Sequence, residues 1–124
     1  MERSAENDDL VERLICDGAL HTPRIINAFE SVDRKDFVTN PSEAYLDKPL
    51  SIGTSETVST ISQPTTVAIM FELLNTNEGD KVLDIGSGSG WTTALLAHVV
   101  GKKGNVTGLE IVPELVDFGA KNLS

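Results

Sequence analysis

The 124-residue chain has few of the residues that mark several protein classes. It contains one cysteine, Cys16, which excludes an intrachain disulfide and gives no sign of an oxidising compartment. Its two histidines, His21 and His98, have no metal-ligand spacing with each other or with Cys16. We therefore expect no metal site, two ordinary, partly buried histidines, and a cysteine that serves as a small packing residue.

Basic residues and long apolar runs are also scarce. Ten Lys and Arg stand against 19 Asp and Glu, which gives a formal net charge of −9. A negative field repels a phosphate backbone, so we exclude nucleic acid as a partner. The longest apolar run, residues 94–100, is interrupted by His98 and too short to span a membrane, and residues 1–13 are too polar for a secretory signal. We expect a soluble, cytoplasmic protein with no membrane partner.

The first third of the chain has two helical patterns. Apolar residues at helical spacing predict an amphipathic helix over residues 8–17, ended by Gly18. A second helix is predicted to begin at Pro23, with the Thr22 hydroxyl as its cap. Over residues 33–60 the periodicity fails, which predicts a loop with at most short strands.

A third helix is predicted to follow this loop. Pro64 suits the first helical position, which makes Gln63 the cap. The expected apolar face of this helix consists of Val67, Met70, Phe71 and Leu74. We expect Met70 to lie in the core.

The last 44 residues have the pattern of one βαβ unit. We predict a strand over residues 81–85, a glycine turn over 86–90 and a helix over 91–100. A second strand follows over 105–109, and a last helix runs over 113–123. The fold class is therefore α/β, with parallel strands.

The glycine turn is the strongest signal for a ligand. Residues 84–90 read Asp-Ile-Gly-Ser-Gly-Ser-Gly between a strand and a helix, where glycines allow close approach to backbone N–H groups and a helix N-terminus. A dinucleotide fingerprint needs a glycine at the sixth position, but that position is Trp91 counting from Gly86 and Thr93 counting from Gly88. No Gly-Lys-Ser/Thr follows, so the turn is not a P-loop.

An acidic residue ends the second predicted strand. Glu110 stands 20 positions after Gly90, where a carboxylate can accept hydrogen bonds from both hydroxyls of a ribose. The two features together predict an adenosyl ligand. The alternative is a tight turn without a ligand and a solvated Glu110.

The Asp-x-Gly-x-Gly-x-Gly pattern resembles motif I of the S-adenosylmethionine-dependent methyltransferases. Four stretches, in the right order, resemble the protein-L-isoaspartate (D-aspartate) O-methyltransferase family: FESVDRKDFV at 29–38, AYLDKPLSIG at 44–53, TISQP at 60–64 and KVLDIGSGSG at 81–90. The resemblance extends from residue 10 to residue 123. Its Thr-Ile-Ser-Gln-Pro stretch is more specific than the glycine turn.

The resemblance implies protein repair. The enzyme would transfer the methyl of S-adenosyl-L-methionine to the free carboxylate of L-isoaspartyl and D-aspartyl residues in age-damaged proteins and peptides. A carboxylate is already ionised at neutral pH and needs no general base, so catalysis would rest on orientation. By resemblance Ser62 is the catalytic residue, which binds the substrate carboxylate or orders the cofactor beside it, and Tyr45, Asp47 and Ser62 contact substrate. The alternatives are a helix cap for Ser62 and a packing role for Tyr45.

The resemblance also implies a set of cofactor contacts. The candidate cofactor-binding residues are Asp84, Ile85, Gly86, Ser87, Gly88, Gly90, Glu110 and Ile111. We expect Asp84 to face the methionine end of the cofactor, near its ammonium group. The alternative is a carboxylate that only stabilises a helix N-terminus.

The implied architecture is a Rossmann-like methyltransferase fold with a small helical N-terminal cap. We expect one partial domain over residues 1–124, with cap and substrate loop over 8–64 and the first half of the cofactor-binding sheet over 65–124. The C-terminal half of the fold is expected to be missing, because a complete sheet needs on the order of 200 residues. The edge of strand 81–85 should then be unpaired, and the chain should self-associate or require the other half.

Two positions depart from the family pattern. Residues 54–60 form a longer segment than the family's usual passage and lack its glutamine, and Asp33 stands where many members have proline. The alternatives to the repair enzyme are another S-adenosylmethionine-dependent methyltransferase, an inactive fragment acting as an interaction module, and an NAD-binding protein.

Overall fold

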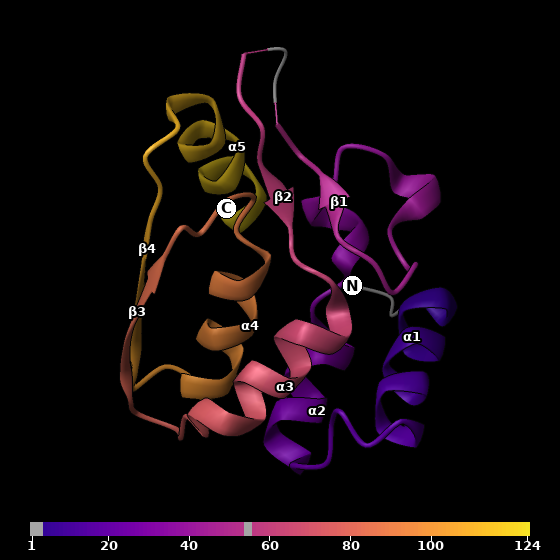
Figure 1. Ribbon diagram of the computed structural model, residues 1–124. Helices are drawn as coiled ribbons and strands as arrows, with labels where there is room; N and C mark the ends of the chain where they lie inside the picture. The colour runs from indigo at the N-terminus through magenta and orange to yellow at the C-terminus, as the bar shows by residue number, and fades with distance from the viewer. Residues whose placement is uncertain (1–3, 54–55) are drawn as a thin grey trace.

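The computed structural model describes residues 4–53 and 56–124 (Figure 1). The departure noted at residues 54–60 therefore lies partly outside the described residues. The elements in chain order are α1 (Ala5–Cys16), α2 (Pro23–Ser31), the 3₁₀ helices η1 (Arg34–Phe37) and η2 (Pro41–Glu43), β1 (Leu50–Ser51), β2 (Thr60–Ile61), α3 (Pro64–Leu74), β3 (Lys81–Ile85), α4 (Trp91–Val100), β4 (Asn105–Leu109) and α5 (Pro113–Leu123). The predicted α/β class is confirmed. None of the described helices combines the length and the hydropathy needed to cross a membrane.

The two N-terminal helices differ from prediction in how they begin. Helix α1 starts at Ala5, three residues earlier than expected, because the Ser4 hydroxyl accepts a hydrogen bond from the Asn7 N–H at 3.3 Å and caps the helix. Helix α2 begins at Pro23 as predicted. Thr22 is its N-cap residue as predicted, but the expected capping bond from the hydroxyl is wrong, since the hydroxyl donates to the Glu72 carboxylate instead.

Cys16 and the two histidines are exposed, so the expected packing and partial burial are wrong for all three. Cys16 follows the buried Leu14 by two residues, which places it about 200° around the helix on the solvent side. His21 lies 3.5 Å from a Glu72 oxygen, and His98 contacts Asn27 on the surface. Local periodicity does not show which side of a short helix a neighbour covers.

Helix α3 buries only part of its predicted apolar face. Val67 and Phe71 are buried as expected. Met70 is 61% exposed and Leu74 is 57% exposed, so the prediction that Met70 belongs to the core is wrong. These two side chains border an open cavity and meet no neighbouring element there.

The core joins the N-terminal helices to the βαβ unit. The Phe29 ring of α2 makes edge contacts with the rings of Phe71 in α3 and Trp91 in α4, both at 5.6 Å between centroids. One buried cluster thus runs through both parts of the chain. The division at residues 8–64 and 65–124 stays a prediction.

The two strand pairs set up the surroundings of the glycine turn. Strands β3 and β4 are parallel, with Lys81 opposite Asn105 and Ile85 opposite Leu109, and α4 connects them as predicted. In the described part of the chain β3 pairs with β4 alone, so the expected unpaired edge of β3 is confirmed. Strands β1 and β2 form a short antiparallel ladder, and α5 lies across the carboxyl ends of β3 and β4 (Figure 1).

Candidate functional site

The glycine turn has the backbone that its composition predicts. Gly86 and Gly90 have φ angles of +78° and +97°, a left-handed conformation that other residues rarely adopt. The N–H groups of Gly86 and Ser87 both donate to the Leu109 carbonyl, at 2.7 and 2.9 Å, which ties the turn to the end of β4. Apart from its two chain neighbours, none of the residues that the structure describes has an atom within 4 Å of the position that a Gly86 Cβ would take. The turn therefore has an open surface at Gly86.

Glu110 is bound to this turn. One carboxylate oxygen accepts a hydrogen bond from the Gly88 N–H at 2.9 Å, and the other accepts one from the Val112 N–H at 3.0 Å. The half-buried carboxylate therefore connects the glycine turn to the start of α5. Glu110 is not the solvated strand end of the alternative interpretation.

Asp84, at the fourth position of β3, contacts the first turn of α4. Its Oδ2 accepts hydrogen bonds from the Thr92 and Thr93 hydroxyls, at 2.6 and 2.8 Å. Its negative charge lies near the helix N-terminus, where the helix dipole favours it. Oδ1 has no hydrogen bond among the described residues, so one oxygen is left for a ligand.

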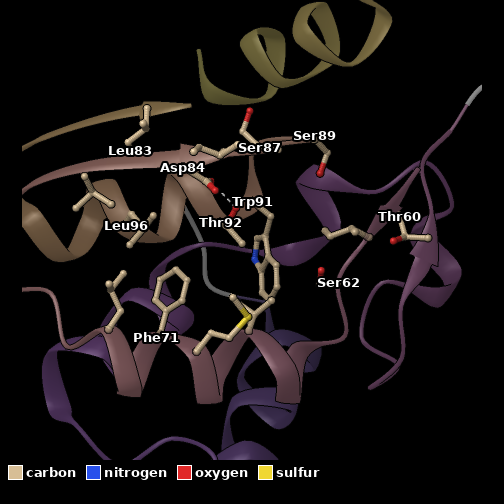
Figure 2. Close-up of a pocket in the computed structure, with 18 of the residues that line it drawn as sticks. Thr60, Ser62, Phe71, Leu83, Asp84, Ser87, Ser89, Trp91, Thr92 and Leu96 are labelled. Carbon is tan, nitrogen blue, oxygen red and sulfur yellow. Dashed lines mark hydrogen bonds between the residues drawn. The ribbon is translucent and has the colours of Figure 1, made fainter. Parts of the chain in front are cut away.

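A cavity of about 580 Å³ brings several predicted residues together (Figure 2). The predicted residues in its lining are Ser62, Asp84, Ile85, Gly86, Ser87 and Gly88. Figure 2 shows Asp84 on the strand side, Phe71 on the helix side and Trp91 between them. Most of the remaining wall is apolar, and half of its residues come from α3 and β3.

A second cavity of about 330 Å³ lies on the other side of the glycine turn. Glu110, Gly88 and Gly90 line it, together with residues of α5. Ser87 and Gly88 belong to the walls of both cavities. The turn thus separates Glu110 from Ser62, and a ligand that contacts both must extend along it.

Helix α5 packs against the far end of the turn. The Asn122 side chain donates a hydrogen bond to the Ser89 carbonyl at 2.9 Å. A side chain placed at Gly90 would lie only 3.2 Å from Leu123. The predicted cofactor contact Ile111 is 93% exposed just before α5 and lines neither cavity. Its role stays a prediction.

Ser62 lies between β2 and α3. Gln63 is the N-cap of α3 and Pro64 is its first residue, as predicted, so Ser62 is not the cap. The Ser62 side chain is exposed on the cavity wall, and its hydroxyl has no hydrogen-bond partner within residues 4–53 and 56–124. An accessible hydroxyl of this kind can bind a ligand oxygen.

The other two predicted substrate residues line neither cavity. The Tyr45 hydroxyl donates to Asp33 at 2.6 Å and accepts from Ser4 at 3.2 Å. Burial, together with the Asp33 carboxylate, raises the pKa of Tyr45 to about 12. The Asp47 carboxylate accepts from the Thr65 N–H and hydroxyl. Their roles as substrate contacts stay predictions.

Sequence reasoning missed Arg34. Its guanidinium is fully buried, donates from Nε to the Ala44 carbonyl at 3.0 Å, and stacks over Trp91 at 4.4 Å from the ring centroid. Burial lowers the pKa of Arg34 to about 10, partly offset by the negative charge of Asp47. No periodic pattern marks a buried arginine. Sequence reasoning also missed the Thr92 and Thr93 hydroxyls. Their place in the first turn of the helix that follows Asp84 and the glycine turn could have predicted this contact.

No group of three or more potential metal ligands occurs in the part of the chain that the structure describes. Neither His21 nor His98 therefore belongs to such a group.

Comparison with known proteins identifies relatives across almost the whole chain. The model of the family described as protein-L-isoaspartate(D-aspartate) O-methyltransferase matches residues 5–124. A protein-L-isoaspartate O-methyltransferase of Methanococcus maripaludis is 40% identical over 117 residues, and protein-L-isoaspartate O-methyltransferase 1 of Arabidopsis thaliana is 42% identical over 120. These matches cover 93% and 95% of this chain but 54% and 51% of the relatives. The chain spans about half the length of the curated relatives it matches.

Solved structures agree with this result. A protein-L-isoaspartate O-methyltransferase superimposes with a TM-score of 0.85 and 30% identity, over 94% of this chain and 38% of its own. A Plasmodium falciparum protein described as a protein-L-isoaspartate O-methyltransferase, in complex with S-adenosyl-L-homocysteine, superimposes with a TM-score of 0.84 and 29% identity, over 99% of this chain and 56% of its own. With the family model matching residues 5–124, the chain belongs to the protein-L-isoaspartate (D-aspartate) O-methyltransferase family.

Proposed function

We propose that this chain provides the methyl-transfer site of an S-adenosyl-L-methionine-dependent protein-L-isoaspartate O-methyltransferase. The substrates would be the free carboxylates of L-isoaspartyl and D-aspartyl residues in age-damaged proteins and peptides. The observation that carries the proposal is one cavity wall shared by the glycine turn, the Asp84 carboxylate and the Ser62 hydroxyl. The family match and the S-adenosyl-L-homocysteine complex of a structural neighbour support it.

The residues present fit an adenosyl and amino acid ligand. Gly86 leaves open space where a side chain would stand. Glu110 on one side of the turn is suited to ribose hydroxyls, and the Oδ1 atom of Asp84 on the other side is suited to an ammonium group. S-adenosyl-L-methionine, when bound, supplies a methyl group on a positively charged sulfur.

The protein's task in such a reaction is positioning. The attacking carboxylate is ionised at neutral pH, so no side chain has to remove a proton. We assign Ser62 Oγ as a donor to one substrate carboxylate oxygen, which turns the other oxygen toward the methyl group. The buried Trp91 and the apolar side chains of α3 give the cavity a mostly apolar wall beside the reacting atoms.

Partners and location follow from the same proposal. Damaged proteins bearing isoaspartyl residues would be the macromolecular partners, and the net charge of −9 disfavours nucleic acid. A cytoplasmic location and the need for a C-terminal half, or for self-association, stay predictions.

Titration calorimetry tests the ligand class directly on the 124-residue chain. We expect S-adenosyl-L-homocysteine to bind and NAD to give no heat. Binding of NAD alone would favour the dinucleotide alternative. Absence of binding by either compound would leave the interaction module as the better explanation.

A chimera tests the reaction. Residues 5–124 would replace the matching half of the Arabidopsis thaliana relative, which is 42% identical over this region. With methyl-labelled cofactor and an isoaspartyl peptide, we expect a base-labile methyl ester, and no label on the same peptide with normal aspartate. A folded chimera that binds cofactor and forms no ester would contradict the proposal.

A further inference from the structure

Helix α3 is capped from a distant part of the chain. Its N-cap residue, Gln63, makes no side-chain capping bond. Asp47, which lies 18 positions before Thr65, supplies the missing acceptor: its Oδ1 accepts from the Thr65 N–H at 2.9 Å, and its Oδ2 accepts from the Thr65 hydroxyl. The backbone carbonyl of Asp47 also accepts from the Gln63 amide at 3.1 Å. One loop residue therefore holds the two residues on either side of Pro64.

These contacts lie immediately after Ser62. On its other side, Ile61 pairs with Leu50 in the β1–β2 ladder, and the Ile52 N–H donates to the Ser59 carbonyl at 2.9 Å. Ser62 thus lies between a strand pair and a pinned helix start. Its own exposed side chain adds no anchoring contact among the described residues, so its position depends on these neighbours.

Arg34 supports the loop that carries Asp47. Its Nε donates to the Ala44 carbonyl at 3.0 Å and its Nη2 donates to the Lys48 carbonyl at 3.4 Å, one on each side of Asp47. The guanidinium stacks over Trp91, the first residue of α4 and part of the cavity wall. Arg34 therefore connects this loop to α4, the helix that follows the glycine turn.

We propose that Asp47 is a positioning residue, which holds the Ser62 hydroxyl on the cavity wall by fixing the start of α3, with Arg34 as its buried support. The proposal rests on the proposed function and gives Asp47 a role without contact to substrate. A cap that only stabilised the helix could stand at residue 63 itself. A carboxylate from the 44–48 loop also fixes where that loop lies relative to Ser62. Through Arg34 and Trp91, the same loop is fixed relative to α4.

The test separates helix capping from positioning. In Asp47→Ala, amide hydrogen exchange at Thr65 and over residues 60–63 should accelerate about 10- to 100-fold, since charged hydrogen bonds are lost. The Ser62 amide resonance should shift. A second substitution, Gln63→Ser, then supplies a local cap. Because it also removes the Gln63 amide bond to the Asp47 carbonyl, Gln63→Ser alone is measured beside it and should leave the Ser62 resonance unchanged. We expect the double variant to recover the melting temperature while the Ser62 resonance and the exchange over 60–63 stay changed.

Asp80→Ala is the matched control, because Asp80 also accepts a backbone N–H, that of Asn77 at 2.8 Å, in an exposed turn away from Ser62. It should leave the Ser62 signals unchanged. Recovery of both melting temperature and Ser62 signals by Gln63→Ser would reduce Asp47 to a helix cap. Unchanged Ser62 signals in Asp47→Ala would also overturn the proposal.

If Asp47→Ala does not fold, Thr65→Val tests the same contact between Asp47 and the start of α3. It removes only the hydroxyl bond to Asp47 and keeps the side-chain shape, and a Ser62 resonance that does not move would contradict the proposal. These measurements need no turnover. A positive result here, together with a folded chimera that binds cofactor and forms no ester, would overturn the proposed function and leave the positioning of Ser62 standing.

Discussion

The carboxylate of Glu110 accepts a hydrogen bond from the Gly88 N–H at 2.9 Å, so the acidic end of β4 is joined directly to the glycine turn after β3. The same carboxylate accepts from the Val112 N–H at 3.0 Å. Glu110 therefore both shapes the turn and, in the proposed function, holds the ribose of the cofactor.

Replacement of Glu110 by Ala should weaken S-adenosyl-L-homocysteine binding, by roughly 1.5 to 3 kcal/mol for each charged hydrogen bond lost. Glu110→Gln keeps the acceptor oxygen for one backbone N–H and should lose less. Calorimetry with Glu114→Ala, an exposed acid in the next turn of chain, provides the control. If Glu110→Ala binds as tightly as the unaltered chain, Glu110 is not part of the cofactor site.

Replacement of Ser62 by Ala should reduce methyl transfer and leave stability nearly unchanged. The Ser62 side chain is exposed and has no hydrogen-bond partner in the described residues, so the free energy of unfolding should change by less than about 0.5 kcal/mol. Rates would be measured in the Arabidopsis chimera and stability by urea unfolding. Parallel losses of rate and stability would show that Ser62 is a structural residue.

The ionisation of Tyr45 should be delayed to strongly alkaline pH. Burial and the bond to Asp33 raise its pKa to about 12, against about 10 for an ordinary tyrosine. The folded state therefore holds this proton more tightly than the unfolded state, and its contribution to stability is complete below pH about 10 and lost as pH rises toward 12.

Absorbance titration can follow this group alone, because the chain has a single tyrosine. Phenolate formation near the ordinary pKa in the folded chain would contradict the observed contact with Asp33. Asp33→Asn should lower the midpoint, since it removes the neighbouring negative charge.

The open edge of β3 should make the 124-residue chain self-associate. Leu83 is 55% exposed and Ile85 is 77% exposed on a strand whose second edge is unpaired among the described residues. Sedimentation should show a mass that rises with concentration, and Leu83→Lys should reduce it. Val58→Lys changes a 99% exposed residue away from this edge and serves as control. A monodisperse monomer that melts cooperatively would refute this expectation.

Local patterns predicted the βαβ unit well. The observed bounds of α4 agree with the prediction because Gly90 and Gly101 flank a mostly apolar segment. Pro113 marked the start of α5 for a similar reason, since proline suits the first helical turn. Gln63 was correctly predicted as a cap residue. These features depend on residues within one turn of each other.

Contacts between distant segments could not be predicted in the same way. The exposure of Met70 depends on whether another element covers that side of α3. The bond between Asp47 and Thr65 joins residues 18 positions apart, and Arg34 is buried by a loop and a helix that no periodicity connects. The residue pattern predicted the glycine turn and the family resemblance predicted Ser62, whereas only the fold shows what holds them in place.

The stacking of Arg34 on Trp91 has a practical consequence. Trp91 is the only tryptophan of the chain, it is 2% exposed, and it lines the large cavity beside the glycine turn. Its indole contacts a guanidinium on one side and the Phe29 ring at its edge. The protein thus carries its single tryptophan between the N-terminal helices and the cavity. Its emission should report both the filling of that cavity and the detachment of those helices.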